Sequence, residues 1–282
     1  MSTLAMVART ATARGNRRAG IGASLLTVLV LVALLAPVLA PHDPNAIDAH
    51  RILAGPDLSH PFGSDALGRD VLSRVLFAYR VSLAVAVGSV LVAMVVGVPL
   101  GLVAGFFGGA VDSLLMRPVD LLLALPALLL ALSLIAIIGP GSGVALFAIA
   151  VIYLPILARV VRSSALSVAG EDYVAGARAR GVSSLGVMLR HVLPNSLGPA
   201  VVQGSVLMGF AIQIEAALSF LGLGAQPPTP SLGLMLADGY QVLQQAPWAD
   251  VFPGLAIAVT VLGFTLIGDG LRDHFDPRGV SR

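Results

Sequence analysis

One carboxylate inside an apolar stretch is the residue best placed for chemistry. Glu215 stands in the middle of GFAIQIEAALSFLG, with Gln213 two residues before it and Met208 seven residues before it. On a helix, Glu215 and Met208 share a face while Gln213 lies on another. A charged group in lipid is costly unless it faces protein or water. We therefore expect Glu215, with Met208 beside it, either to line a pathway or to be hydrogen-bonded into a helix bundle.

Histidine could bind a metal, but its placement does not favour a site. His42, His50 and His60 fall in one polar segment, and none forms an i, i+4 pair or has a second ligand at a usual spacing. His191 and His274 also lack an evident partner. The sequence predicts no metal site.

Two residue types are missing, and their absence excludes whole classes of chemistry. Without cysteine there is no disulfide, thiolate nucleophile or cysteine-ligated metal. All 17 basic residues are arginine, so the lysine of a phosphate-binding P-loop is absent. No Ser/His, paired-Asp or HExxH arrangement lies in the apolar stretches, which argues against an intramembrane enzyme. We expect no catalytic residue and no cofactor in this chain; if ATP drives it, partner chains bind the ATP and Mg²⁺.

The charged segment from Gly170 to Asn195 has the pattern of a helical hairpin. Glu171 and Asp172 would lie in the first turn of one helix, with Arg178 and Arg180 in its last turn. Gly181 stands where a left-handed C-cap is needed. Such a charged hairpin between apolar stretches indicates a docking surface for another protein.

A second helix is predicted directly after this glycine. Ser183 can cap it, Pro194 should end it, and its apolar residues recur at i, i+3, i+4 and i+7. These residues are Leu185, Met188, Leu189 and Val192. A DNA-binding helix-turn-helix is a weak alternative, because basic runs with interleaved aromatic residues are missing.

Composition and hydropathy describe an all-α membrane protein that must position these residues. Apolar residues make up 57% of the 282 and charged residues only 11%. Six stretches are long enough to span a bilayer as helices. They are residues 21–40, 81–107, 115–138, 143–161, 199–222 and 251–271. The first could be mistaken for a secretory signal, but its apolar run is long and Pro41 follows the possible cleavage site, so we interpret it as a retained anchor.

Arginine placement predicts the orientation. With the N-terminus in the cytoplasm, thirteen of the 17 arginines fall in cytoplasmic segments. This puts both termini and the 170–195 hairpin inside, and two longer segments, 41–80 and 223–250, outside.

Several shorter sequence patterns predict local structure within and between the spans. Gly97, Gly101 and Gly105 repeat every four residues, a face that permits close helix packing. Residues 62–80 have the pattern of an amphipathic helix at the outer interface, with an i, i+4 ion pair of Asp70 and Arg74 on its polar face. Its apolar stripe consists of Val71, Leu72, Val75, Leu76 and Tyr79. The alternative is that this segment contacts a binding protein directly. Gln226 to Ser231, rich in proline, should be a stiff outer loop. Asp120 and Asp269, at cytoplasmic ends of spans, should have a helix-end or arginine partner.

The hairpin resembles the EAA loop of bacterial ABC importer permeases. The spacing of that motif is matched throughout, with Ala175 in place of the family's Glu and Gly176 in place of its first Ala. The matching positions are Ala175, Gly176, Ala177, Gly181, His191, Leu193 and Pro194, and Arg190 lies among them. Glu171 and Asp172 could compensate for the missing Glu.

Three further stretches resemble the C-type permease subunit of dipeptide, oligopeptide and nickel importers: residues 60–74, 218–233 and 268–278. The resemblance implies a six-helix type I importer permease in the inner membrane that forms half of a channel. It also implies a second homologous permease chain, two cytoplasmic ATP-binding subunits or domains, and an extracytoplasmic substrate-binding protein.

The expected organisation is a tail at 1–20, a first span with its outer lead-in at 21–80, a permease domain at 81–278 with its coupling loop at 162–198, and a tail at 279–282. Uptake of dipeptides or oligopeptides is the expected function. Nickel or another small solute is the alternative, and an ion-coupled secondary carrier using Glu215 is the alternative from another class.

Overall fold

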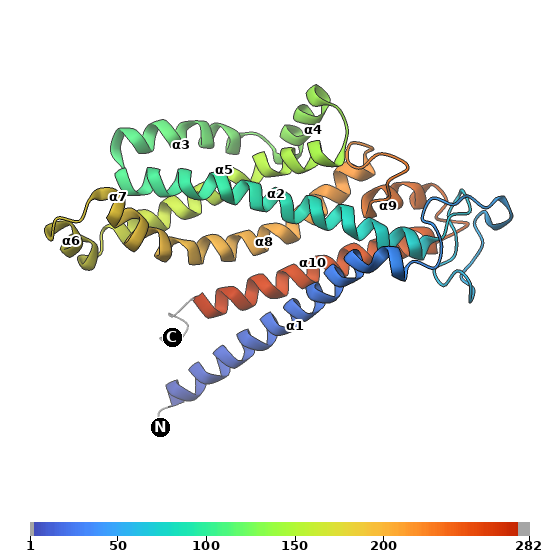
Figure 1. The fold of residues 1–282 in the computed structure, drawn as a ribbon, viewed down its shortest axis with the longest axis horizontal. Helices are drawn as coiled ribbons and strands as arrows, with labels where there is room; N and C mark the ends of the chain where they lie inside the picture. Colours follow the sequence, from blue (N-terminus) through green and yellow to red (C-terminus); the bar gives the residue numbers. More distant parts are fainter. Residues whose placement is uncertain (1–2, 276–282) are drawn as a thin grey trace.

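Long runs of apolar residues produce five helices that can each cross a membrane. The structure is a computed structural model that describes residues 3–275. The long helices are α1 (Thr3–Leu39, apolar from Ala19), α2 (Val71–Phe107), α5 (Ser142–Ala169), α8 (Leu193–Phe220) and α10 (Trp248–Phe275). Figure 1 shows them side by side along one long axis. The protein is thus an all-α, multi-pass membrane protein, as predicted.

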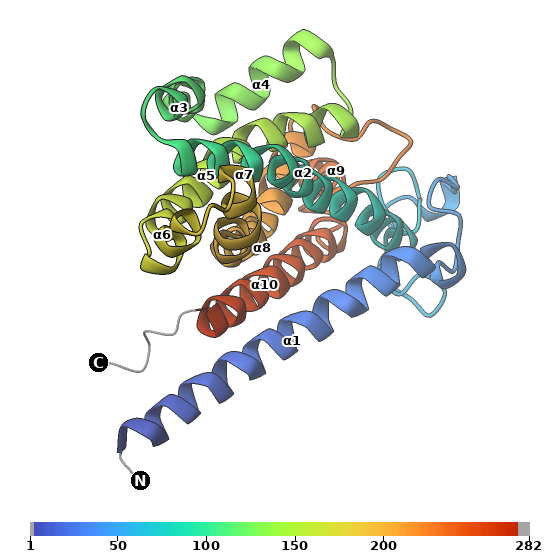
Figure 2. The ribbon, with the colours of Figure 1, turned by 60° about the vertical axis from the view of Figure 1, so that its left-hand side comes forward.

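The single helix predicted over 115–138 is broken in the structure. Two helices, α3 (Gly109–Ala124) and α4 (Ala127–Ile138), meet there at an angle of 95° (Figure 2). The cause is Pro126, which cannot donate a backbone hydrogen bond and forces Leu125 into an extended conformation, with φ −88° and ψ 138°. The described chain has six spans only if this bent pair counts as one.

Glycine allows α2 and α5 to pack closely. A Cβ atom at Gly101 would lie 2.2 Å from the carbonyl oxygen of Ala158, and one at Gly105 would lie 2.5 Å from that of Arg162. Gly97 faces the same helix at Leu154. The small-residue face predicted from the sequence is confirmed, and its partner is α5.

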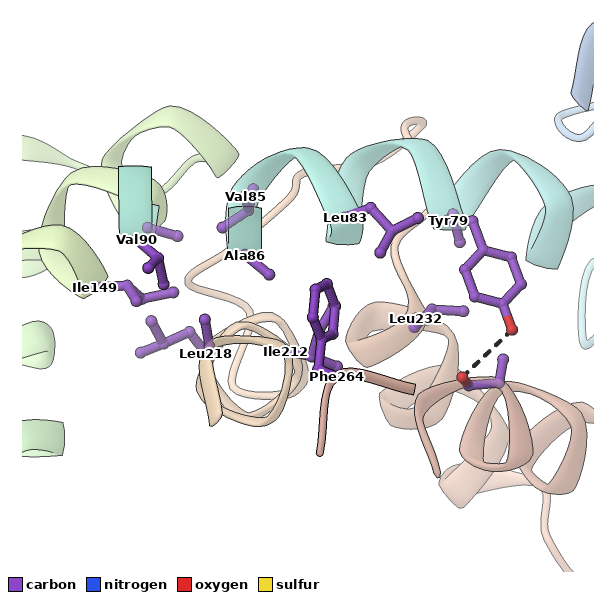
Figure 3. Close-up of a cluster of buried hydrophobic side chains, with 14 of the residues drawn as sticks. Tyr79, Leu83, Val85, Ala86, Val90, Ile149, Ile212, Leu218, Leu232 and Phe264 are labelled. Atoms are coloured by element: carbon purple, nitrogen blue, oxygen red, sulfur yellow. Dashed lines mark hydrogen bonds between the residues drawn. The ribbon is translucent and has the colours of Figure 1, made fainter. Parts of the chain in front are cut away.

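The apolar core joins α2, α5, α8 and α10. Figure 3 shows Val90, Ile149, Ile212 and Phe264 converging from these four helices. At one edge of the cluster the hydroxyl of Tyr79 donates a hydrogen bond to the carbonyl of Ala256 over 3.3 Å. Helix α1 runs along α10, where Gly22 and Gly270 let the two backbones approach, and it adds Leu26, Leu29 and Ala33 to the cluster.

The two ends of the bundle differ. One end carries α6 (Asp172–Ala179) and α7 (Ser184–Val187), and the start of α1 and the end of α10 lie toward that same end in Figure 1. The other end carries the irregular segment after α1, which contains the short helix η1 (Ala49–Arg51), together with α9 (Leu232–Gln241). Helix α9 lies in the outer segment 223–250, for which no helix was predicted, and Gln226–Ser231 before it is non-helical as predicted.

The predicted surface helix before the second span is also corrected. Helix α2 starts at Val71 and continues without a break into the membrane-spanning part. Asp70 caps it by accepting a hydrogen bond from the backbone of Ser73, and does not pair with Arg74. Arg74 is buried, not on a polar surface, because it reaches carboxylates outside its own helix.

Candidate functional site

The charged hairpin forms as its capping signals predict. Helix α6 begins after Glu171, with Asp172 in its first turn and Arg178 in its last turn. Arg180 is the C-cap residue, one position beyond the helix, and Gly181 follows with φ +83°. The Ser183 side chain then accepts a hydrogen bond from the backbone of Gly186 and starts α7.

The predicted end of the second helix at Pro194 is wrong. After α7 the chain forms one π-helical segment, η2 (Met188–Val192), and passes directly into α8, so the helix is continuous from Ser184 to Phe220. A proline ring normally clashes with the carbonyl four residues earlier. The wider π turn, in which the N–H of Leu193 donates to the carbonyl of Met188, accommodates it. The hairpin is therefore rigidly attached to a membrane-spanning helix.

Buried side chains fix the hairpin to the ends of α2 and α5. Val174, Ala177 and Val187 pack together against Phe106 and Val168. The guanidinium of Arg178 lies over the ring of Phe106, 5.2 Å from its centroid. Further along, Met188 and Val192 enter a second cluster between α2 and α5.

Two leucines of the predicted apolar stripe are exposed, although the other two residues of the stripe are buried. Leu185 is 60% exposed and Leu189 is 47% exposed, whereas Met188 and Val192 are buried. Tyr173 of α6 is also 47% exposed. Leu185 and Leu189 are four residues apart and so share a helix face, and exposed large apolar residues on one face indicate an interaction surface. We call Tyr173, Leu185 and Leu189 the apolar patch of the hairpin.

The remaining residues of the motif differ in their exposure. Glu171, Asp172, Ala175, Gly176, Arg178, Gly181, Arg190 and Pro194 are exposed, Ala177 is buried, and His191 and Leu193 are half-buried. The side-chain amide of Asn195 donates to the carbonyl of His191 over 2.6 Å and to the hydroxyl of Tyr173 over 3.3 Å. This pair of bonds ties α6 to the start of α8, a link that the sequence did not reveal.

Glu215 lies inside the bundle. It is 1% exposed, and one of its carboxyl oxygens accepts a hydrogen bond of 2.7 Å from the Ser219 hydroxyl. The other oxygen, Oε2, is buried without a hydrogen-bond partner among the described residues. Met208 is half-buried against the same core and Gln213 is exposed, in agreement with their expected faces.

Ion pairs join helices near the hairpin end of the bundle. Arg159 of α5 contacts Asp120 of α3 over 2.8 Å, which is the arginine partner expected for Asp120. One turn along, Arg162 pairs with Asp112. These four residues, with Arg117, line a cavity of about 250 Å³.

A second group of ion pairs lies at the opposite end of the bundle, around α9. The side chain of Arg69 lies 2.7 Å from Asp65 and 3.4 Å from Asp238 of α9, and the guanidinium of Arg74 lies 3.5 Å from Asp65. Burial raises the pKa of Asp238 above its usual value, against the effect of Arg74 and Arg69. The irregular segment is thereby fastened to α9.

Comparison with known proteins identifies the architecture. The family described as binding-protein-dependent transport system inner membrane component matches residues 97–279, which include the whole hairpin. The chain belongs to this family. A second family, the N-terminal TM domain of oligopeptide transport permease C, matches residues 12–56.

Similar curated proteins cover nearly the whole permease. It is 43% identical to the dipeptide transport system permease protein DppC of Alkalihalophilus pseudofirmus, over 94% of this chain and 88% of the relative. It is 43% identical to the glutathione transport system permease protein GsiD of Pectobacterium atrosepticum, over 89% and 84%. A di/tripeptide transport system permease protein of Pseudomonas aeruginosa is 40% identical over 93% and 89%. The resemblance to C-type permease subunits is confirmed, and the protein is a permease component of an ABC importer.

Proposed function

We propose that this permease forms half of an inner-membrane channel that imports dipeptides or oligopeptides. Relatives named for dipeptide, di/tripeptide and glutathione transport support a peptide as the solute. Nickel or another small solute is the alternative. A second, homologous permease chain forms the other half, and an extracytoplasmic binding protein delivers the solute. Both termini and the hairpin lie in the cytoplasm, and α1 is a retained anchor.

The hairpin is the coupling element in this proposal. Two separate ATP-binding subunits hold ATP and Mg²⁺, since this chain has no lysine for a P-loop. One of them docks on the apolar patch and on the charges around it. The observation that carries the proposal is the continuous helix from Ser184 to Phe220, because it joins the exposed patch to the buried core.

The mechanism follows from that continuity. When ATP binding closes the ATPases, the hairpin moves as a rigid unit, and α5 and α8 tilt with it. The glycine face of α2 packs on α5, so α2 follows. The channel thus alternates between an outward and an inward opening, and no covalent step takes place in this chain.

Cysteine cross-linking tests the docking surface. The chain has no cysteine, so Leu185→Cys introduces a single thiol in the apolar patch. In the assembled complex we expect this thiol to cross-link to a cysteine placed on the ATPase. The matched control is Leu58→Cys, a fully exposed leucine at the opposite end of the bundle. Equal cross-linking from both positions, or none from Leu185→Cys and Leu189→Cys alike, contradicts the proposal.

A further inference from the structure

Three potential metal ligands that are distant in sequence meet at the irregular end of the bundle. His42 follows α1, His60 lies in the irregular segment, and Asp70 caps α2. One candidate ligand atom from each lies within 4.8 Å of the others. The two imidazole rings are stacked, with 4.3 Å between their centroids. Sequence spacing could not reveal this cluster, because the chain between its members is irregular.

Only one of the two carboxylate oxygens of Asp70 has hydrogen-bond partners among the described residues. Its Oδ2 accepts hydrogen bonds from the backbone N–H and the hydroxyl of Ser73. Its Oδ1 is buried and has no hydrogen-bond partner among the described residues. A buried oxygen of this kind is costly unless something binds it. His42 approaches the carboxylate at its other oxygen, with Nδ1 3.9 Å from Oδ2.

His60 is held in an orientation that suits a ligand. Its Nδ1 lies 3.1 Å from the Ser59 hydroxyl and 3.9 Å from Asp57. Metal-binding histidines commonly use one ring nitrogen for such an orienting contact and the other for the metal. Nε2 of His60 is the nitrogen that these contacts leave free.

We propose that His42, His60 and Asp70 bind one zinc ion, which fastens the segment after α1 to the first turn of α2. Two imidazoles and one carboxylate are a ligand set that suits zinc, with a further position for water. His42 is exposed, so its ring can adjust to the ion and the ion can enter from solvent. The ion is structural in this role and is not the transported solute.

The test uses the complete permease complex, purified without a polyhistidine tag and stripped with a chelator. Zinc is titrated back while bound metal per complex and thermal unfolding are measured. We expect one zinc per copy of this chain at the cluster and a rise in Tm. His60→Ala should weaken zinc binding at least about tenfold and remove the rise in Tm. His50→Ala is the matched control, since His50 lies in the same segment outside the cluster, and it should bind zinc as the wild type does.

A second variant covers the case in which His60→Ala does not fold. Asn is as good an N-cap as Asp, so Asp70→Asn keeps the start of α2 while removing the charged ligand. It should also lose zinc. Wild-type zinc affinity in both variants, or zinc binding that leaves the wild-type Tm unchanged, overturns the proposal. Absence of zinc binding by the wild-type complex overturns it as well.

Discussion

Gly181 joins the two helices of the hairpin through a backbone conformation that most side chains avoid. Its φ of +83° lies in the left-handed region, where a β-branched residue is strained by about 1–3 kcal/mol. We expect Gly181→Val to distort the apolar patch, so that fewer ATPase subunits co-purify with the membrane complex and peptide uptake falls several-fold. Gly176→Ala is the control, because Gly176 is helical and a Cβ there meets nothing within 4 Å. Wild-type assembly and uptake in Gly181→Val would remove the docking claim.

Asp238 gives a prediction about pH at the opposite end. Burial raises its pKa, so its contribution to stability is present below the unfolded pKa and is lost as pH rises through the folded value. Asp238→Asn should therefore gain stability relative to the wild type as pH increases from about 4 to 7. Thermal unfolding of the complex across that range measures the difference. A difference that is constant with pH would contradict the assignment.

Some of these residues could be placed from the sequence and others could not. Caps at Ser183 and Gly181 were predictable, because they act within a few residues of the chain. The prediction that Arg74 lies on a polar surface and pairs with Asp70 was wrong. Its partner Asp65 and the neighbouring Asp238 lie outside its helix, and Asp238 is brought near only by folding. The cluster of His42, His60 and Asp70 was missed for the same reason.

At the scale of elements, the packing of α2 on α5 depends on the absence of a side chain at Gly101. A Cβ there would lie 2.2 Å from a backbone oxygen, and no side-chain rotation can relieve that contact. Gly101→Ala should push the helices apart and cost about 1–3 kcal/mol, seen as a lower Tm of the complex and lower uptake.

Gly143→Ala is the matched change on α5, where a Cβ atom meets nothing within 4 Å. Its Tm should stay near that of the wild type. If the two alanine variants unfold at the same temperature, close packing at Gly101 is not what holds α2 against α5.

The elements themselves were largely predictable from apolar length, but two of the helix boundaries at prolines were not. Two prolines show why. Pro126 breaks a span, whereas Pro194 lies inside a continuous helix. A π turn precedes Pro194, and its residues Met188 and Val192 are buried between neighbouring helices. That burial is a tertiary effect that periodicity does not contain.

In the whole molecule, the charged hairpin and the irregular segment with α9 lie at opposite ends of the helix bundle. The hairpin end exposes apolar and charged residues, and at the opposite end ionic contacts join the irregular segment to α9. Glu215 lies buried between them, and one of its oxygens is bound by Ser219. In a coupled importer this carboxylate supports or lines the pathway, whereas in a secondary carrier it would be the coupling site.

Glu215→Gln distinguishes these two roles because it keeps size and hydrogen-bonding capacity while removing the titrating group. In the importer, the variant should take up peptide at an altered rate that still depends on ATP. In a proton-driven carrier, the same variant should lose its dependence on the gradient or stop altogether.

Peptide uptake into proteoliposomes that contain the full complex and its binding protein tests whether ATP drives this permease. ATP and a proton gradient are imposed separately, and radiolabelled dipeptide accumulation is measured for the wild type and for Glu215→Gln. We expect accumulation with ATP alone and none with the gradient alone in both proteins. Uptake that a gradient drives without ATP, and that Glu215→Gln abolishes, would contradict it.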